Sequence, residues 1–182
     1  SNTTLTKYNN NSSYGTVDGK EVLDMDDDAA RANWGGDWRM PTSAEWQELA
    51  SNTYMKWEYN YAATGVSGFI VYKVKYDADR GLMTIDENYE PENPGWVTYD
   101  QDWNEAELTG EYSTSDAHLF LPAAGYRGGT DVNDAGSCGY YSSSSLYSFF
   151  PSYAYLMFFS SGSVCPQCNN YRSYGFSVRP VQ

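Results

Sequence analysis

The sequence is poor in basic residues, and it contains no long apolar run. Its 11 Lys and Arg stand against 24 Asp and Glu, which gives a formal net charge of -13. A chain of this charge repels phosphate backbones and anionic lipid headgroups, so we expect no nucleic-acid partner. No stretch approaches the ~20 apolar residues of a membrane-spanning helix, so we expect no direct membrane insertion.

Residues for the common catalytic chemistries are also scarce. His118 is the only histidine, which leaves a hydrolase triad without a base. Neither GxSxG, GxGxxG nor the Walker A pattern occurs. The sequence neither identifies nor excludes a pair of carboxylates for glycoside hydrolysis, because only the distance between the two groups would identify such a pair. We expect no enzyme activity and no cofactor.

Three cysteines allow at most one disulfide. Cys165 and Cys168 have CxxC spacing, which suits a zinc ligand pair or a thiol redox couple. Zinc needs a second pair of ligands, for which the chain offers only Cys138 and His118, and redox chemistry needs a βαβ context. The preferred interpretation is two unrelated thiols in a loop and no metal site.

A second candidate metal pattern lies in an acidic stretch. Asp100, Asp102, Asn104 and Glu111 occupy positions 1, 3, 5 and 12 of a calcium-loop pattern. Glu105 stands where the sharp turn needs Gly, which favours a solvated acidic loop. Calcium binding at this stretch is left open.

What the chain does contain is aromatic residues, which make up 17% of it, with 18 Tyr. Tyr gives recognition surfaces a large contact area at a low entropy cost, so the composition favours binding. Residues 1–182 are long enough for one domain. The polar beginning, SNTTLTKYNNNSS, is expected to be the cut end of a larger secreted protein.

The residue patterns predict two short helices and then strands. Acidic residues precede a helical pattern near Asp26 to Asn33, and a second helix is expected at about 43–51. Thr42 and Glu45 have capping-box spacing there, with Ala44, Trp46 and Leu49 facing inward. The strand candidates are KWEYNY, GFIVYKVKY, GLMTI, HLFLPAAGYR, YAYLMFF and GFSVRPV. This order predicts an α+β fold with an acidic insertion at about 74–117.

Three motifs carry a family resemblance: WGGDWRMPTSAEW (34–46), LPAAGYRGG (121–129) and GFSVRPV (175–181). Together they resemble the Fibrobacter succinogenes major paralogous domain family, over about residues 14–181. The resemblance implies a C-type-lectin-like fold with a mostly antiparallel, irregular sheet, shared with formylglycine-generating enzymes. It also implies secretion or display on a bacterial surface.

The enzyme branch of this fold is similar in the WRMPTSAEW segment, but it uses a pair of cysteines near the C-terminus. Here Ser177 stands where the closing motif of the enzymes resembles GFRC, and Cys165 and Cys168 lie upstream of that position. The resemblance therefore does not extend to oxidative catalysis.

Residues 136–174 resemble the variable region of proteins that retroelements diversify by mutating template adenines. In such templates AAY codons become NNY codons, which encode neither Lys, Glu, Gln, Met nor Trp. After Asp134 the chain has no Asp, Glu, Lys or Trp, and within 136–174 its only Met and Gln are Met157 and Gln167. The resemblance implies that Cys138, Cys165 and Cys168 are products of codon sampling.

Within AYLMFFSSGSV the template pattern implies that Ala154, Tyr155, Met157 and Phe159 face the core. Leu156, Phe158 and Ser160 then face the other side, in keeping with the strand period of two. A strand that is covered on both faces remains the alternative. The predicted ligand-binding surface consists of Ser137, Cys138, Tyr140, Tyr147, Ser148, Phe149, Phe150, Ser152, Tyr153, Leu156, Phe158, Ser160, Ser163, Cys165, Cys168, Asn169, Asn170, Tyr171, Ser173 and Tyr174.

Three further residues of the C-terminal region bear on the division between framework and surface. Ser142 falls where the family would have a framework Trp. Arg172 and Arg179 are the only charged residues after Asp134. Arg179 is expected in the framework, buried through its stem or paired with an acid, while Arg172 fits either the framework or the surface.

The resulting hypothesis is a ligand-binding display protein, an adhesin at a bacterial or phage surface, such as a pilus tip within a larger surface assembly. Its partner would be a protein or a glycan on another cell or surface. The alternative is a surface domain of the same family that is not diversified, with a carbohydrate-binding or structural role. An oxidative or metal-dependent enzyme is the third hypothesis.

Overall fold

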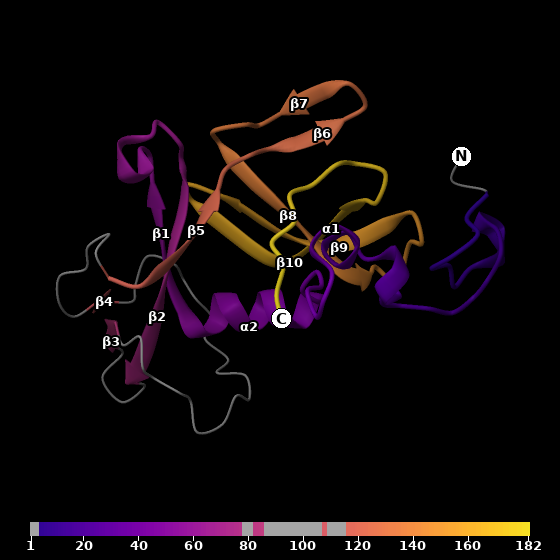
Figure 1. The fold of residues 1–182 in the computed structure, drawn as a ribbon, viewed down its shortest axis with the longest axis horizontal. Helices are drawn as coiled ribbons and strands as arrows, with labels where there is room; N and C mark the ends of the chain where they lie inside the picture. Colours follow the sequence, from indigo (N-terminus) through magenta and orange to yellow (C-terminus); the bar gives the residue numbers. More distant parts are fainter. Residues whose placement is uncertain (1–3, 78–81, 86–106, 109–115) are drawn as a thin grey trace.

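The computed structural model describes residues 4–77, 82–85, 107–108 and 116–182 (Figure 1). Short 3₁₀ helices are η1 (Ser12–Tyr14), η2 (Met25–Asp27) and η3 (Tyr61–Ala63), and the α-helices are α1 (Ala29–Trp34) and α2 (Ser43–Asn52). The strands are β1 (Thr53–Glu58), β2 (Gly68–Asp77), β3 (Leu82–Ile85), β4 (Glu107–Leu108), β5 (His118–Pro122), β6 (Tyr126–Gly128), β7 (Asp131–Asn133), β8 (Cys138–Leu146), β9 (Tyr153–Ser160) and β10 (Ser163–Tyr171).

These strands form three sheets. The first has the order β1-β2-β3-β4, with β5 also paired to β2, and its pairs are antiparallel except for β3 with β4. The second has the order β10-β9-β8, and β6 with β7 forms a ribbon that projects at the top of Figure 1. The predicted α+β class, with two α-helices near the N-terminus and mostly antiparallel strands, is confirmed.

Helix α1 starts later than the sequence predicts. Asp26 lies in η2, and Asp28 is the N-cap residue of α1. Asp28 is buried; its Oδ1 accepts from the N–H groups of Ala30 (2.8 Å) and Arg31 (3.1 Å), and its Oδ2 accepts from Met40 N–H (2.9 Å). One carboxylate therefore fixes both the start of α1 and the WRMPTSAEW segment.

Helix α2 begins where the sequence predicts. Thr42 Oγ1 accepts from Glu45 N–H (3.2 Å) and Glu45 Oε2 accepts from Thr42 N–H (2.8 Å), which confirms the capping box. Trp46 and Ala50 are buried on the face that meets the sheets. The inward position predicted for Ala44 is wrong, because this exposed residue lies about 200° around the helix from Trp46.

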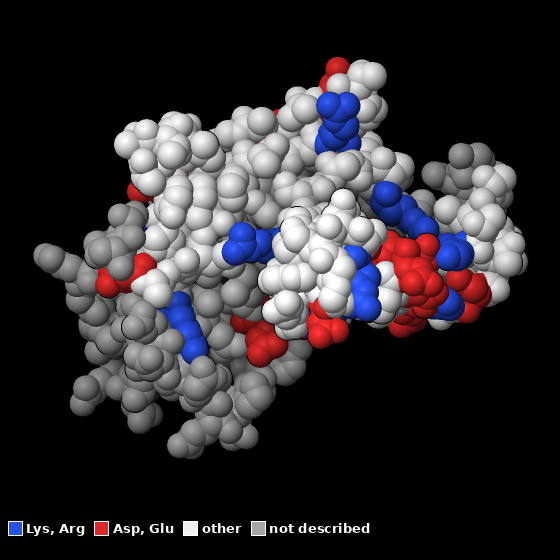
Figure 2. All heavy atoms as spheres, in the orientation of Figure 1, with Lys and Arg blue, Asp and Glu red and all other residues white. Residues whose placement is uncertain are grey.

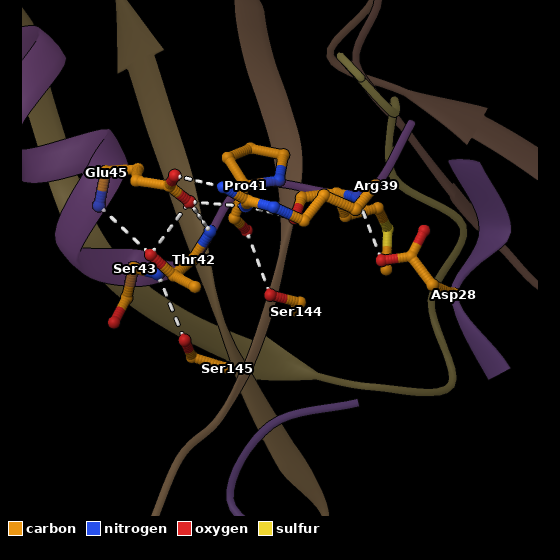
Figure 3. Close-up of polar contacts among 9 residues, drawn as sticks. Asp28, Arg39, Pro41, Thr42, Ser43, Glu45, Ser144 and Ser145 are labelled. Atoms are coloured by element: carbon orange, nitrogen blue, oxygen red, sulfur yellow. Dashed lines mark hydrogen bonds and ion pairs between the residues drawn. The ribbon is translucent and has the colours of Figure 1, made fainter. Parts of the chain in front are cut away.

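The first turn of α2 is bonded to strand β8, far along the chain (Figure 3). Ser43 N–H donates to Ser145 Oγ (3.1 Å), and Ser144 N–H donates to Pro41 O (2.8 Å). Arg39 adds an ion pair with Glu45, at 2.5 Å between Nη2 and Oε1. We call this network the α2 anchor; it consists of Asp28, Arg39, Pro41, Thr42, Ser43, Glu45, Ser144 and Ser145.

The core lies between α2 and the inner faces of the two larger sheets. Trp46 meets Tyr141 at a centroid distance of 6.0 Å, and Phe159 meets Phe69 at 5.1 Å. Met157 is fully buried among them. The complete buried cluster is Trp46, Ala50, Met55, Phe69, Val71, Leu121, Ala123, Tyr141, Met157 and Phe159.

The strand predictions succeed in part. GFIVYKVKY and YAYLMFF coincide with β2 and β9, GLMTI contains β3, and KWEYNY overlaps the end of β1. HLFLPAAGYR is wrong as a single strand, because β5 ends at Pro122 and the last two residues of the motif belong to β6. GFSVRPV is wrong as a strand, since it makes only isolated bridges, through Gly175, Ser177 and Val181. The sequence did not predict β8 and β10, whose Ser, Gly, Cys and Pro lack an apolar alternation.

Most of the acidic insertion predicted at about 74–117 lies outside the described residues. Its described parts are the end of β2 together with β3 and β4. The calcium-pattern residues also lie outside them: Asp100, Asp102, Asn104 and Glu111.

The Glu45→Gln variant should weaken the fold by about 1 kcal/mol at neutral pH, as expected for a partly exposed ion pair. The hydrogen bonds of Glu45 to Arg39 and Thr42 lower its pKa from 4.5 to about 2. The stabilisation is therefore complete above the unfolded pKa and is lost as the pH falls from about 5 towards 2. Urea unfolding over this range measures it.

The exposed Glu48 of the same helix supplies the matched control. Glu48→Gln should keep the pH dependence of the wild-type protein. If Glu45→Gln keeps it as well, the ion pair with Arg39 does not stabilise the folded state.

Candidate functional site

The three-stranded sheet presents two different faces. Tyr141 lies opposite Met157 in the register, and Gly139 lies opposite Phe159, with these side chains in the core. Tyr140 lies opposite Phe158, one position along each strand, so that this pair faces the other side. The predicted core positions of Met157 and Phe159 are confirmed, and both residues are fully buried.

Gly139 makes room for the central ring of the core. A Cβ atom at this position would lie 2.0 Å from Phe159 Cζ, so no larger residue fits without moving the ring. Phe159 also stacks on Tyr141 at a centroid distance of 5.8 Å. The inner face is therefore closely packed, and this packing fixes which side chains point outward.

Aromatic side chains outside the core cluster form one continuous series of ring contacts. From the turn between β8 and β9, Tyr147 meets Phe150 (6.3 Å), Phe150 meets Tyr153 (6.0 Å) and Tyr153 meets Tyr171 (4.4 Å). Tyr171 then meets Tyr174 at 5.6 Å. The first half of the series thus joins β9, β10 and the turns that flank them.

The series continues to the β6–β7 ribbon. Tyr174 meets Tyr126 (5.2 Å), Tyr126 meets Tyr140 (5.0 Å), and Tyr140 meets Phe158 (5.1 Å) and Phe176 (5.8 Å). Phe149 meets Tyr147 at the first end (5.6 Å). We call these rings the aromatic row; they are Phe149, Tyr147, Phe150, Tyr153, Tyr171, Tyr174, Tyr126, Phe176, Tyr140 and Phe158.

Exposure varies along the aromatic row. Phe149 and Phe150 are 74% and 53% exposed and Tyr171 is 37% exposed, while the other rings are half-buried. Every aromatic residue of the predicted surface belongs to the row. The predicted surface does not include Tyr126 and Phe176, which lie within the motifs LPAAGYRGG and GFSVRPV.

Two predicted surface residues are buried, and these assignments are wrong. Leu156 is 2% exposed because it lies at the centre of the middle strand, between its register partners Ser142 and Cys168. Ser152 is 8% exposed, and its carbonyl accepts from Arg172 N–H (3.0 Å) at the base of the turn. The alternative of a strand covered on both faces thus holds for Leu156.

The small residues of the predicted surface surround the aromatic row on β8–β10 and their turns. Those that are exposed are Ser137, Ser148, Ser163, Asn169 and Ser173, and those that are half-buried are Cys138, Ser160, Cys165, Cys168 and Asn170. Tyr155, predicted to face the core, is half-buried and meets Tyr147 at 5.2 Å.

Cys165 and Cys168 form a disulfide, so the interpretation as unrelated thiols is wrong. Their register partners are Phe158 and Leu156, so β10 has one extra residue between them. This bulge places both cysteines on one face of the strand, where they can bond. Cys138 is the free cysteine of the chain.

The two arginines of the region have opposite environments. Arg172 is half-buried and donates to the carbonyls of Tyr8 (3.0 Å), Pro151 (3.1 Å) and Lys7 (3.4 Å), which places it in the framework. Arg179 is exposed, so the prediction that its stem is buried is wrong. Neither arginine belongs to the aromatic row, and the charged group bonded to the row is the Asp134 carboxylate, at Tyr140.

Two tyrosines of the row, Tyr140 and Tyr153, have a raised pKa. Burial and the hydrogen bond to Asp134 raise the pKa of Tyr140, whose hydroxyl donates to Asp134 Oδ2 (2.8 Å). The hydrogen bond with Tyr171 raises the pKa of Tyr153. The row thus offers ring faces and hydroxyl groups as its contact chemistry.

Other candidate chemistry has a structural role. The ring of His118 lies within hydrogen-bonding distance of Tyr61 Oη (2.8 Å) and Asp116 O (2.7 Å). Within the described ranges, no group of three His, Cys, Asp or Glu could hold a metal ion. None of the helices that the structure describes is long and apolar enough to cross a membrane.

One comparison with known proteins gives a similarity. Residues 102–181 match the profile of a family described as a domain of unknown function (DUF8237). This range includes β5 to β10 and the C-terminal segment, and thus the whole aromatic row. No curated protein and no solved structure matches the chain.

The two faces of the sheet should respond differently to truncation. Phe159→Ala should lower the free energy of unfolding by about 3–5 kcal/mol, because it leaves a cavity in the core. Phe149→Ala should change it by less than about 0.5 kcal/mol, because that ring is mostly exposed. Chemical denaturation of both variants measures the difference, and equal losses would contradict the assignment of the faces.

Proposed function

We propose that this protein is a ligand-binding display protein of the adhesin or receptor type, in which the aromatic row binds a protein or a glycan on another cell or surface. The observation that carries the proposal is the continuity of the row of ring contacts along β8–β10, the turns that flank them and the β6–β7 ribbon. Aromatic rings provide contact area, and the Ser and Asn side chains around them provide adaptable hydrogen bonds. Binding of this kind makes and breaks no covalent bond.

The distribution of charge fits a surface for uncharged contacts. In Figure 2 acidic and basic side chains gather at the right of the molecule, over the N-terminal part of the chain. The described residues of the C-terminal region bear only Arg172 and Arg179 as charges after Asp134. A largely uncharged aromatic patch is the composition found at the centre of protein interfaces.

We further propose a C-type-lectin-like fold and membership of the Fibrobacter succinogenes major paralogous domain family. The contacts among the three motifs support this. Arg39 and Val181 exchange backbone hydrogen bonds (3.0 and 2.9 Å), and so do Arg127 and Gly175 (2.8 Å each). The motifs thus act as one framework, with the C-terminal segment bonded to the other two. A bacterial surface or secreted location follows from this proposal.

Diversification by a retroelement is the third part of the proposal. Within residues 136–174, Met157 and Gln167 are the residues that adenine mutation of AAY codons cannot produce. Met157 is fully buried in the core. Gln167 Nε2 donates to Ser43 O (3.4 Å) at the start of α2. Both residues have framework roles, as constant positions should.

The gene locus tests diversification. We expect a near-identical template repeat that differs from the coding repeat only at adenines, with a reverse-transcriptase gene beside it. Sequencing the locus gives the answer. A locus with neither feature would leave the aromatic row as the fixed surface of a domain that is not diversified.

The capacity of the surface to bind ligands can be measured with a displayed library. NNY codons at Tyr147, Phe149, Phe150 and Tyr171 should give folded clones, and selection on immobilised lysozyme should enrich binders from them. The matched control library varies Tyr141, Met157 and Phe159 and should yield few folded clones. Folded row variants that never enrich on any probe protein would argue against a recognition surface.

A further inference from the structure

A cavity of about 520 Å³ lies beside the aromatic row. Its walls are the N-terminal residues 4–8, residues 142–146 of β8, and side chains from β9 and the C-terminal segment, among them Ala154, Tyr174 and Phe176. The exposed rings Phe149 and Phe150 do not line it. A cavity of this size is in the range of small-molecule sites, about 300–1,000 Å³.

The β8 wall is held in place from outside the sheet. Ser142 pairs with Leu156 and Leu146 with Ala154, so residues 142–146 of β8 lie opposite only residues 154–156 of β9. Leu146 N–H therefore donates to Glu21 O (2.7 Å), and the α2 anchor binds Ser144 and Ser145. The serine hydroxyl groups on this wall are thus presented from a fixed backbone.

Two of these hydroxyl groups, those of Ser143 and Ser145, have donor capacity for a ligand. Ser143 Oγ accepts from Ser145 N–H (3.0 Å), and Ser145 Oγ accepts from Ser43 N–H (3.1 Å). A hydroxyl that accepts one hydrogen bond can still donate its own proton. Sugar hydroxyl groups are suitable acceptors for such donors.

The charges on the cavity wall leave one cation without a counter-ion. Lys7, Asp27 and Arg172 are the charged residues that line the cavity. Lys7 Nζ pairs with Asp27 Oδ2 at 2.7 Å. Arg172 donates only to backbone carbonyls, and no carboxylate in the described part of the chain pairs with it.

Burial of this guanidinium is costly without an anion. Desolvation by burial lowers the pKa of Arg172, although the charge of Asp18 acts in the opposite direction. Three of its five N–H groups donate to Tyr8, Pro151 and Lys7. The fork geometry of Arg suits a carboxylate, which can accept two N–H groups at once.

Aromatic rings complete the lining. Tyr155, Tyr174 and Phe176 reach the cavity from the side of the aromatic row. Ring faces provide flat apolar area, which the less polar face of a sugar ring can cover. We propose that this cavity is a binding site for a carboxylate-bearing sugar, of the uronic or sialic acid type, with its carboxylate on Arg172 and its hydroxyl groups on the serine wall.

This site goes beyond the proposed function, because it takes a small acidic ligand rather than a macromolecular surface. The wild-type protein should be titrated with glucuronic acid and with N-acetylneuraminic acid. Calorimetry measures the affinity, and changes in the backbone amide chemical shifts locate the site. At least one acid should bind ten times or more tightly than glucose and inorganic phosphate. Shifts should concentrate at residues 142–146 and 172–176.

Two variants place the ligand in the cavity. Ala154→Leu narrows the cavity and should weaken binding of the acid at least tenfold. Arg172→Lys keeps the positive charge but loses the forked guanidinium. It should weaken binding of the acid more than it weakens binding of glucose. Thermal unfolding of each variant confirms that it is folded before titration.

The matched control is Phe149→Ser, which lies outside the cavity. It should leave binding of the acid unchanged while it weakens the binding of ligands to the aromatic row. The cavity and the aromatic row are therefore tested independently. Equal binding of glucose and the acids, equal binding of phosphate, no binding at all, or shifts located elsewhere would each overturn the proposal.

Discussion

The α2 anchor is the constraint on which both candidate binding features depend. A strand as rich in Ser as β8 has little apolar surface with which to fix its own position. The capped first turn of α2 supplies what is missing, because it binds Ser144 and Ser145 at the point where β8 bulges away from β9. Asp28 and the pair of Arg39 with Glu45 hold that turn in place. Polar contacts, rather than apolar packing, thus position this edge of the sheet.

The sheet places a closely packed core on one side and aromatic rings such as Tyr140 and Phe158 on the other by simple alternation along its strands. Adjacent residues such as Tyr140 and Tyr141, or Phe158 and Phe159, are of the same type but lie on opposite faces of the sheet. The inner partner of each pair packs against Trp46 or Phe69, and the outer one joins the aromatic row. Composition alone gives no hint of this division, and the register decides it.

Sequence reasoning found what local chemistry encodes. The capping box at Thr42 and Glu45 needs only neighbouring residues, so α2 could be predicted closely. The bulges could not, because they depend on which strands pair: one bulge brings Cys165 and Cys168 to the same face, and the other opens the cavity. The burial of Leu156 and the contribution of Tyr126 to the row follow from tertiary neighbours, which no local pattern contains.

Contact between rings makes the aromatic row a coupled surface. Tyr153 touches Phe150 on one side and Tyr171 on the other, so a change at this position alters the packing of two further rings. Residues in contact have non-additive effects when they are replaced. Variation along the row therefore does not act one position at a time. The effect of a replacement at one ring therefore depends on which residues stand at the neighbouring positions.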